Sequence, residues 1–214
     1  MPGLLQRPLR YSYFNATVVL IAANLLLFIL SWLSPRAGIV LALIPSAVLR
    51  AGTWWQPVTY MFVHSGFQHI FFNMLALFLF GIQLERRLGS TEFLLYYLFC
   101  GIGAGLATVF INFAAGMGGV PVVGASGAIF GLLLAFASFF PEARIFIFGI
   151  VPIRAPTAVA LYAAVEIVMQ FWNVRSGSRS GVAHLTHLAG LAFGYLYLLV
   201  RFRINPIQVF FRRR

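Results

Sequence analysis

The stretch PVVGASGAIFGLLLAF, residues 121–136, places Ser126 between Gly124 and Gly127 at the start of a long apolar run. Glycines around a hydroxyl are common in a surface turn and unusual at the edge of a membrane span. Ser126 is therefore either a small residue that lets helices pack closely or a nucleophile. The choice depends on what the rest of the chain places at the same depth.

The composition excludes an ordinary soluble protein. The chain is 61% hydrophobic and only 9% charged, with a mean hydropathy of +0.93, whereas soluble domains carry about a quarter charged residues. Several apolar runs approach or exceed the ~18 residues that span a bilayer. We therefore expect an all-α membrane protein of six spans, forming a single membrane domain over residues 1–214 without a separate soluble domain. The expected spans are residues 14–33, 66–84, 92–113, 126–140, 155–172 and 182–202.

The segment between the first two spans, residues 34–65, differs from the other connections. Its apolar run GIVLALIPSAVL is too short to cross a bilayer and contains Pro45. The aromatic run TWWQPVTYMF follows, and tryptophan and tyrosine favour the membrane–water interface. We expect a structured first loop that lies in the interface. The first span follows Arg7 and Arg10 without a convincing small-residue cleavage site, so we expect it to be retained.

All 15 basic residues are arginine, and the net charge is +11. The arginines flank apolar segments, so we interpret them as topology signals and expect no nucleic-acid partner. A cytoplasmic N-terminus places eleven on the cytoplasmic side: Arg7, Arg10, Arg86, Arg87, Arg144, Arg154, Arg201, Arg203, Arg212, Arg213 and Arg214. It places four outside: Arg36, Arg50, Arg175 and Arg179. The positive-inside rule therefore predicts a multi-pass protein of the inner (plasma) membrane with both termini in the cytoplasm.

With this topology, the second, fourth and sixth spans begin on the outer side. His69 and Asn73, four residues apart, share one face of the second span. Ser126 opens the fourth span, and His184 and His187 lie in the first turns of the sixth. At 1.5 Å per residue these groups lie within ~5–12 Å of the outer helix ends. Since the fourth span is short, we expect its serine to lie below the outer surface, where irregular backbone must be buried or line a wet cavity.

The acidic residues limit the possible chemistry. The chain has no aspartate and four glutamates, Glu85, Glu92, Glu142 and Glu166, and the first three are expected on the cytoplasmic side. A Ser-His-Asp triad and a two-aspartate protease are excluded, and no HExxH motif is present. A serine with a histidine as general base remains, and such a base must lie within ~2.6–3.2 Å of the hydroxyl. This chemistry requires no cofactor and no metal.

Small residues recur at helical spacing after the serine and after one histidine. They are Gly127 and Gly131 in the fourth span, and Gly190 and Gly194 in HLAGLAFG after His187. Facing stripes of glycine let two helices approach closely, which would bring Ser126 against His187. Candidate donors to an oxyanion are the Ser126 amide at a helix N-terminus, His69 and the Asn73 amide.

The order HSGFQHIFFNM, GASG and AHLTHLAGLAFG closely resembles the rhomboid family of intramembrane serine proteases over almost the whole chain. The resemblance implies that Ser126 is the nucleophile, that His187 is the general base, and that His69, Asn73 and the Ser126 amide form the oxyanion site. It implies supporting positions at His64, Gly124, Gly127, Phe130, Gly190 and Gly194, with Phe130 against the catalytic histidine. The implied substrates are single-span membrane proteins, cut within or near the outer part of their transmembrane helix.

One position departs from the family pattern. The first loop usually carries Trp-Arg, and the arginine meets the segment that here reads ERRLG, residues 85–89. This chain has Trp55 and Gln56 instead, so we expect the loop to depend on Trp54, Trp55 and Tyr60 at the interface. A change of Gln56 to alanine is then expected to be mild.

Other interpretations of the polar residues remain open. The chain is alternatively a non-proteolytic rhomboid-superfamily protein that binds clients, or a metal transporter that uses its four histidines. Against a metal site, we expect no carboxylate or thiolate at the depth of these histidines in the membrane. His184 is a pocket wall or an interface histidine. Glu166 is a candidate functional residue because it lies within a span, but pairing with an outer arginine or with Gln170 is the alternative, and we expect no direct catalytic role.

Overall fold

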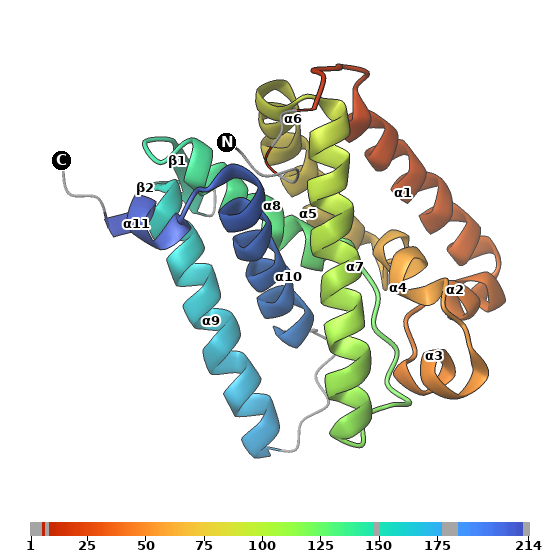
Figure 1. The fold of residues 1–214 in the computed structure, drawn as a ribbon. Helices are drawn as coiled ribbons and strands as arrows, with labels where there is room; N and C mark the ends of the chain where they lie inside the picture. Colours follow the sequence, from red (N-terminus) through yellow and green to blue (C-terminus); the bar gives the residue numbers. More distant parts are fainter. Residues whose placement is uncertain (1–5, 7–8, 148–149, 177–183, 212–214) are drawn as a thin grey trace.

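The computed structural model describes residues 6, 9–147, 150–176 and 184–211, and this part of the chain is mainly helical (Figure 1). Five helices within it are long and apolar enough to cross a membrane. They are Ala16–Leu33, Phe67–Leu88, Ser90–Ala114, Ala155–Ser176 and His184–Phe202. These helices correspond to five of the six expected spans, and the molecule is a membrane-type helical bundle.

Two of the long helices contain a wider π-type turn. The helix over residues 67–88 consists of α5 (Phe67–Ala76), the π turn η3 (Leu77–Gly81) and α6 (Ile82–Leu88). The last long helix consists of α10 (His184–Tyr197) and the π turn η4 (Leu198–Phe202). The others are α1 (Ala16–Leu33), α7 (Ser90–Ala114) and α9 (Ala155–Ser176). Turns of this type often occur at functional sites.

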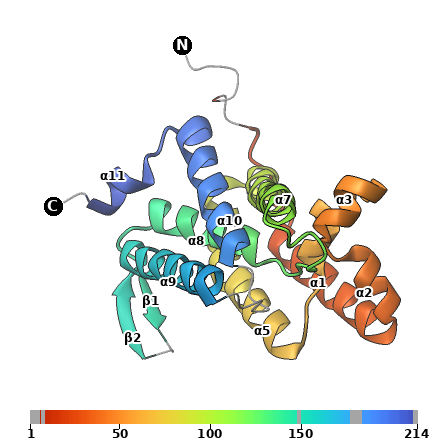
Figure 2. The same cartoon turned by 90° about the horizontal axis from the view of Figure 1, so that it is seen from below.

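The remaining expected span is the short helix α8 (Ser126–Phe139). Its 14 residues extend ~21 Å, which is less than a ~30 Å hydrocarbon core. Eleven of them are buried, and the helix packs against α7, α9 and α10. Seen along the bundle, α8 and α10 lie beside each other between α7 and α9 (Figure 2). A short helix is stable here because protein, rather than lipid, surrounds most of it.

The first loop is structured, as expected. It contains α2 (Pro35–Leu41), α3 (Pro45–Ala51), α4 (Gln56–Thr59) and the 3₁₀ turn η2 (Tyr60–Phe62). A proline opens α2 and α3, where its missing N–H costs no helical hydrogen bond. Trp54 and Trp55 are exposed, but Tyr60 is fully buried and its hydroxyl donates to the carbonyl of Gly101 at 2.7 Å. The expected interfacial position of Tyr60 is therefore wrong.

A small sheet corrects the all-α prediction. Strands β1 (Arg144–Ile147) and β2 (Val151–Arg154) pair antiparallel, with Arg144 opposite Arg154. Arg154 also pairs with the exposed carboxylate of Glu142 at 2.7 Å. Each strand has only four residues, so no alternating pattern is long enough to identify it in the sequence.

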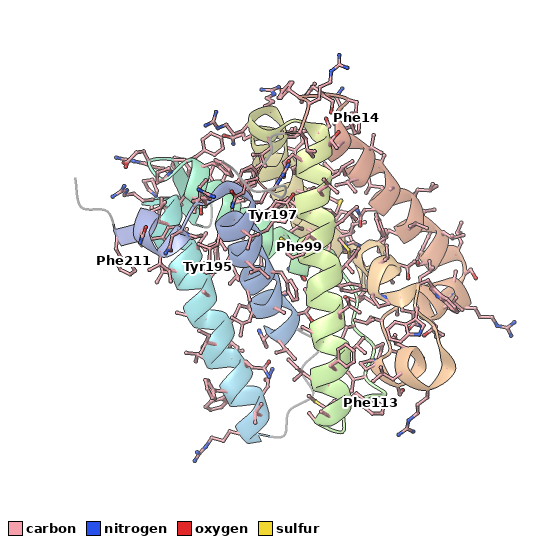
Figure 3. All side chains as sticks on the ribbon, viewed as in Figure 1. Phe14, Phe99, Phe113, Tyr195, Tyr197 and Phe211 are labelled. Carbon is pink, nitrogen blue, oxygen red and sulfur yellow. The ribbon has the colours of Figure 1, made fainter. Side chains whose placement is uncertain are left out.

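The bundle has two distinct ends (Figure 1). Helices α1, α7 and α9 begin at the end that also carries the β hairpin and α11 (Pro206–Phe211), and we call this the arginine-rich end. Helix α10 runs in the opposite direction, and we call the end where it begins the serine end. Phe14 and Phe113 lie towards opposite ends, while the rings of Phe99 and Tyr197 meet between α7 and α10 with centroids 5.4 Å apart (Figure 3).

Carboxylates hold the arginine-rich end together. Glu85 accepts hydrogen bonds from the backbone of Ala16 at 2.5 Å and of Thr17 at 2.9 Å, which satisfies the first N–H groups of α1. Glu92 accepts two bonds from the guanidinium of Arg201, at 2.8 and 2.6 Å. Both carboxylates are buried and bonded to structural partners.

Candidate active site

Helices α8 and α10 approach each other backbone to backbone. A Cβ on Gly190 would lie 1.9 Å from the carbonyl oxygen of Gly127, and one on Gly194 would lie 3.1 Å from the Cα of Gly131. Only glycine fits the first position, because no side chain can occupy that space. The close approach that the two glycine stripes predicted is confirmed.

This approach joins the serine to one histidine. The Nε2 atom of His187 lies 2.7 Å from the Oγ atom of Ser126, within the range that a general base requires. The ring of Phe130, one turn after the serine on α8, stacks on the imidazole with centroids 4.4 Å apart and planes 10° apart. One helix thus carries both the hydroxyl and the aromatic face that fixes the plane of the imidazole.

The turn before the serine depends on Gly124. Its φ of 116° lies in the region that favours glycine. A Cβ there would lie 2.7 Å from the Nε2 atom of His69 and 3.7 Å from the hydroxyl of Ser126. The structure therefore brings His69 to the serine turn, and glycine is the residue that leaves room for it.

The first loop holds the segment that leads into α8. Leu43 and Val122 exchange two backbone hydrogen bonds of 3.0 and 2.8 Å, and the amide of Gly124 donates to the carbonyl of Tyr60 at 2.9 Å. A loop that is distant in sequence thereby sets the backbone of the serine turn.

Gln56 stabilises the same loop from within. Its side chain is 3% exposed, accepts a hydrogen bond from the amide of Ile44 at 2.9 Å and donates to the carbonyl of Val40 at 3.4 Å. Glu85, the partner that an arginine at this position would meet, is already bonded to the start of α1. Gln56 thus anchors the loop to its own backbone, so we expect Gln56→Ala to cost more than the sequence suggested.

The two candidate oxyanion side chains on α5 differ in placement. The amide of Ser65 donates to Nδ1 of His69 at 3.4 Å, which leaves the ring proton on the Nε2 atom near Gly124. The Asn73 side chain instead donates to the carbonyl of His69 on its own helix at 2.8 Å. His64 is buried and contacts His69 edge to face, with centroids 5.0 Å apart. His69 is therefore oriented towards the serine turn, whereas the Asn73 amide is bonded within α5.

Sequence reasoning missed the surroundings of Glu166. Its carboxylate lies between two imidazoles, 2.5 Å from Nδ1 of His184 and 3.0 Å from Nδ1 of His187. The expected pairing with an arginine or with Gln170 is not what the structure shows, and the expectation that no carboxylate joins the histidines is wrong. The three ligand-type atoms lie within 4.8 Å of one another.

The relative depth of α9 and α10 in the bundle explains why the sequence did not predict the contacts of Glu166. Glu166 lies near the middle of α9, ~16 Å from its first residue, whereas both histidines lie at the start of α10. Figure 1 shows that α9 continues past the start of α10, so the middle of one helix is level with the beginning of the other. A comparison of helix ends in the sequence cannot reveal this offset.

Comparison with known proteins places these residues in one family. The model of the Rhomboid domain matches residues 51–204, which is more than half of the chain and includes Ser126, His187 and Glu166. The chain belongs to the rhomboid family. It is 32% identical over 149 residues to YdcA of Bacillus subtilis (strain 168), a match that covers 68% of this chain and 66% of that protein.

Two further relatives extend the comparison. The match to the mitochondrial rhomboid protein 1 of Saccharomyces cerevisiae is 37% identical over 142 residues and covers 64% of this rhomboid and 38% of the relative. The match to the rhomboid protease AarA of Providencia stuartii is 30% identical over 177 residues and covers 72% of this rhomboid and 59% of the relative. This rhomboid thus spans less than two thirds of the length of each relative, and it is a multi-pass membrane protein by its apolar helices.

Proposed function

We propose that this rhomboid is an intramembrane serine endopeptidase with Ser126 as the nucleophile and His187 as the general base. The observation that carries the proposal is the 2.7 Å separation of the Ser126 hydroxyl and the His187 Nε2 atom inside a bundle of membrane-type helices. A serine hydroxyl is a weak nucleophile until such a base removes its proton. Two residues 61 positions apart in the sequence meet here in the geometry that this chemistry needs.

The geometry supports a two-step reaction. The Nε2 atom of His187 accepts the hydroxyl proton while the Oγ atom of Ser126 bonds to the substrate carbonyl carbon. The resulting oxyanion is stabilised by the Ser126 amide at the N-terminus of α8 and by the Nε2–H group of His69. His187 then protonates the leaving amine as the C–N bond breaks, and the same base activates a water that hydrolyses the acyl-enzyme. The proton that His187 takes from this water returns to the Oγ atom of Ser126 as the acyl group leaves, which restores both residues.

The substrates are single-span membrane proteins, and the cut lies within or near the outer part of their transmembrane helix. A helix hides its carbonyls in hydrogen bonds, so the substrate must unwind locally before attack. Small residues at the cut and helix-breaking residues nearby meet this requirement. The arginine-rich end faces the cytoplasm in this proposal, in accord with the positive-inside rule.

The test is cleavage by the purified protein, reconstituted in liposomes with a panel of single-span substrates. Ser126→Ala and His187→Ala are expected to lower kcat by about 10⁴-fold or more, since a nucleophile without its base retains little rate. Ser138→Ala is the matched control, because this hydroxyl lies on the same helix and donates to the carbonyl of Leu134. Cleavage that persists in Ser126→Ala would refute the proposal. Client binding without cleavage by the unaltered protein would favour the non-proteolytic alternative.

A further inference from the structure

We propose that Glu166 is a positioning residue for the general base. Ser126, His187 and Glu166 then act as a triad. This inference rests on the proposed protease function and adds a third member to the serine and histidine. The described contacts of Glu166 are to the imidazoles of His184 and His187. It acts through the imidazole of His187, by selecting its tautomer and by stabilising its protonated form.

The contacts on the two imidazole nitrogens carry the first step of the argument. The Nε2 atom of His187 faces the Ser126 hydroxyl at 2.7 Å, and the Nδ1 atom lies 3.0 Å from Oε1 of Glu166. An ionised carboxylate only accepts hydrogen bonds, so the ring nitrogen beside it must carry the proton. The other nitrogen then presents its lone pair to the hydroxyl. Glu166 therefore selects the tautomer that a general base requires.

The alignment of this contact indicates when it matters most. In the resting arrangement the Nδ1 atom of His187 is close to the carboxylate but makes no hydrogen bond of good geometry with a described residue. The stack on Phe130 fixes the plane of the imidazole. Once the ring has accepted the serine proton, it is a cation beside a carboxylate. The electrostatic attraction between His187 and Glu166 then increases. Catalytic contacts commonly tighten in this way only as the reaction proceeds.

His184 holds the carboxylate for this purpose. Its Nδ1 atom lies 2.5 Å from Oε2, so each oxygen of Glu166 faces a different imidazole. His184 is buried, and the carboxylate is thereby oriented by one histidine towards the other. Within the described part of the chain, the titratable groups that face His187 are Glu166 on α9, His184 on its own helix and His69 on α5.

The test is Glu166→Gln in the full reconstituted protein, with kcat and KM measured as a function of pH. We expect kcat to fall by about 10- to 1,000-fold, less than the ~10⁴-fold seen in soluble triads because Phe130 still holds the ring. KM should change less than about threefold. Because the charge beside the general base is removed, the pH profile of kcat should also change.

Glu92→Gln is the matched control. It also removes a buried carboxylate, but one that binds Arg201 and Tyr197 at the arginine-rich end. It should lower stability and leave the kcat and pH profile of the folded fraction unchanged. Labelling of Ser126 by a fluorophosphonate should slow in Glu166→Gln in proportion to kcat, and should not slow in Glu92→Gln.

Three results would overturn the inference. An unchanged kcat and pH profile in Glu166→Gln would remove Glu166 from the mechanism. A lowered melting temperature with an unmoved pH profile would assign it a structural role only. Loss of activity of the unaltered protein with a chelator, restored by added zinc, would show that Glu166, His184 and His187 hold a metal instead. Failure of the protease proposal is distinguishable, since the unaltered protein would then neither cleave substrates nor react with the probe at Ser126.

Discussion

Two buried carboxylates at different levels of the bundle illustrate how partners decide what a residue does. At the arginine-rich end, Glu92 binds the guanidinium of Arg201 through both oxygens and also accepts from the hydroxyl of Tyr197 at 2.6 Å. At the serine end, Glu166 lies between two imidazoles. Arginine keeps its charge at every physiological pH, so the first arrangement is fixed.

The second arrangement places the carboxylate beside a reactive pair. The ring of His187 also contacts the Ser126 hydroxyl. The same type of side chain therefore stabilises the fold at one end and supports proton transfer at the other. The following variants test this division between a structural end and a reactive end.

Among these variants, the largest effect is expected from Gly190→Ala at the serine end. A Cβ there would meet the carbonyl oxygen of Gly127, so α8 and α10 must separate and the serine must move away from the base. Displacements of about 1 Å can cost ~100-fold in rate, and we expect kcat to fall by at least that factor. Gly119→Ala is the control, since a Cβ there meets nothing within 4 Å. Wild-type kcat in Gly190→Ala would contradict the close approach.

Glu92→Gln should show the opposite pattern, with a large effect on stability and little on catalysis. Removal of one partner from a buried ion pair leaves the charge of the other partner poorly compensated. We therefore expect a loss of roughly 2–4 kcal/mol in the free energy of unfolding. Thermal unfolding in detergent measures the loss, and cleavage per folded molecule should be unchanged. A fall in kcat without a fall in stability would mean that the two ends are coupled.

Gln56→Ala tests the loop that supports the serine turn. The change leaves the partly buried amide of Ile44 without its acceptor, which should cost about 1–3 kcal/mol of stability. Gln83→Ala is the matched control, because that exposed side chain donates to the carbonyl of Leu79 on its own helix. Equal melting temperatures for the two variants would show that Gln56 does not anchor the loop.

His64 provides the smallest and most specific effect, a dependence of stability on pH. Burial, aided by the neighbouring His69, lowers the pKa of His64 to about 4 from an ordinary value of 6.5. Below about pH 6.5 the unfolded chain binds a proton that the folded chain does not, so this contribution to stability is lost as the pH falls towards 4. The loss should be about 1 kcal/mol between about pH 7 and pH 5.5.

The measurement compares melting temperatures of the unaltered protein and His64→Phe over this range. As the pH falls, the melting temperature of the unaltered protein should decrease relative to that of His64→Phe. Parallel curves would show that His64 does not titrate in the way its burial implies.

The sequence predicted the elements that local patterns determine. Apolar runs located the long helices within a few residues, and glycines after Ser126 and His187 predicted that their helices touch. The shortness of α8 was also evident, because Pro141 and Glu142 directly follow its apolar run. These features depend on residues that are close in sequence, and their physical causes act over one or two helical turns.

The parts that sequence reasoning missed depend on the relative placement of distant elements. Glu166 reaches the histidines because α9 continues past the start of α10, and no local pattern records that offset. The Asn73 amide is bonded within its own helix, although its spacing from His69 places both on one face. Gln56 is bonded to the backbone of its own loop. The family pattern, which has an arginine at this position, did not suggest these partners.

The central claim is that Ser126 is a nucleophile activated by His187, and labelling of the purified protein by a fluorophosphonate tests it most directly. The protein in liposomes is treated with the probe, digested, and the adduct is located by mass spectrometry. The account predicts a single adduct on Ser126 in the unaltered protein and in Ser138→Ala, and a strong loss of labelling in His187→Ala. An adduct on another residue, or equal labelling of Ser126 in His187→Ala, would contradict it.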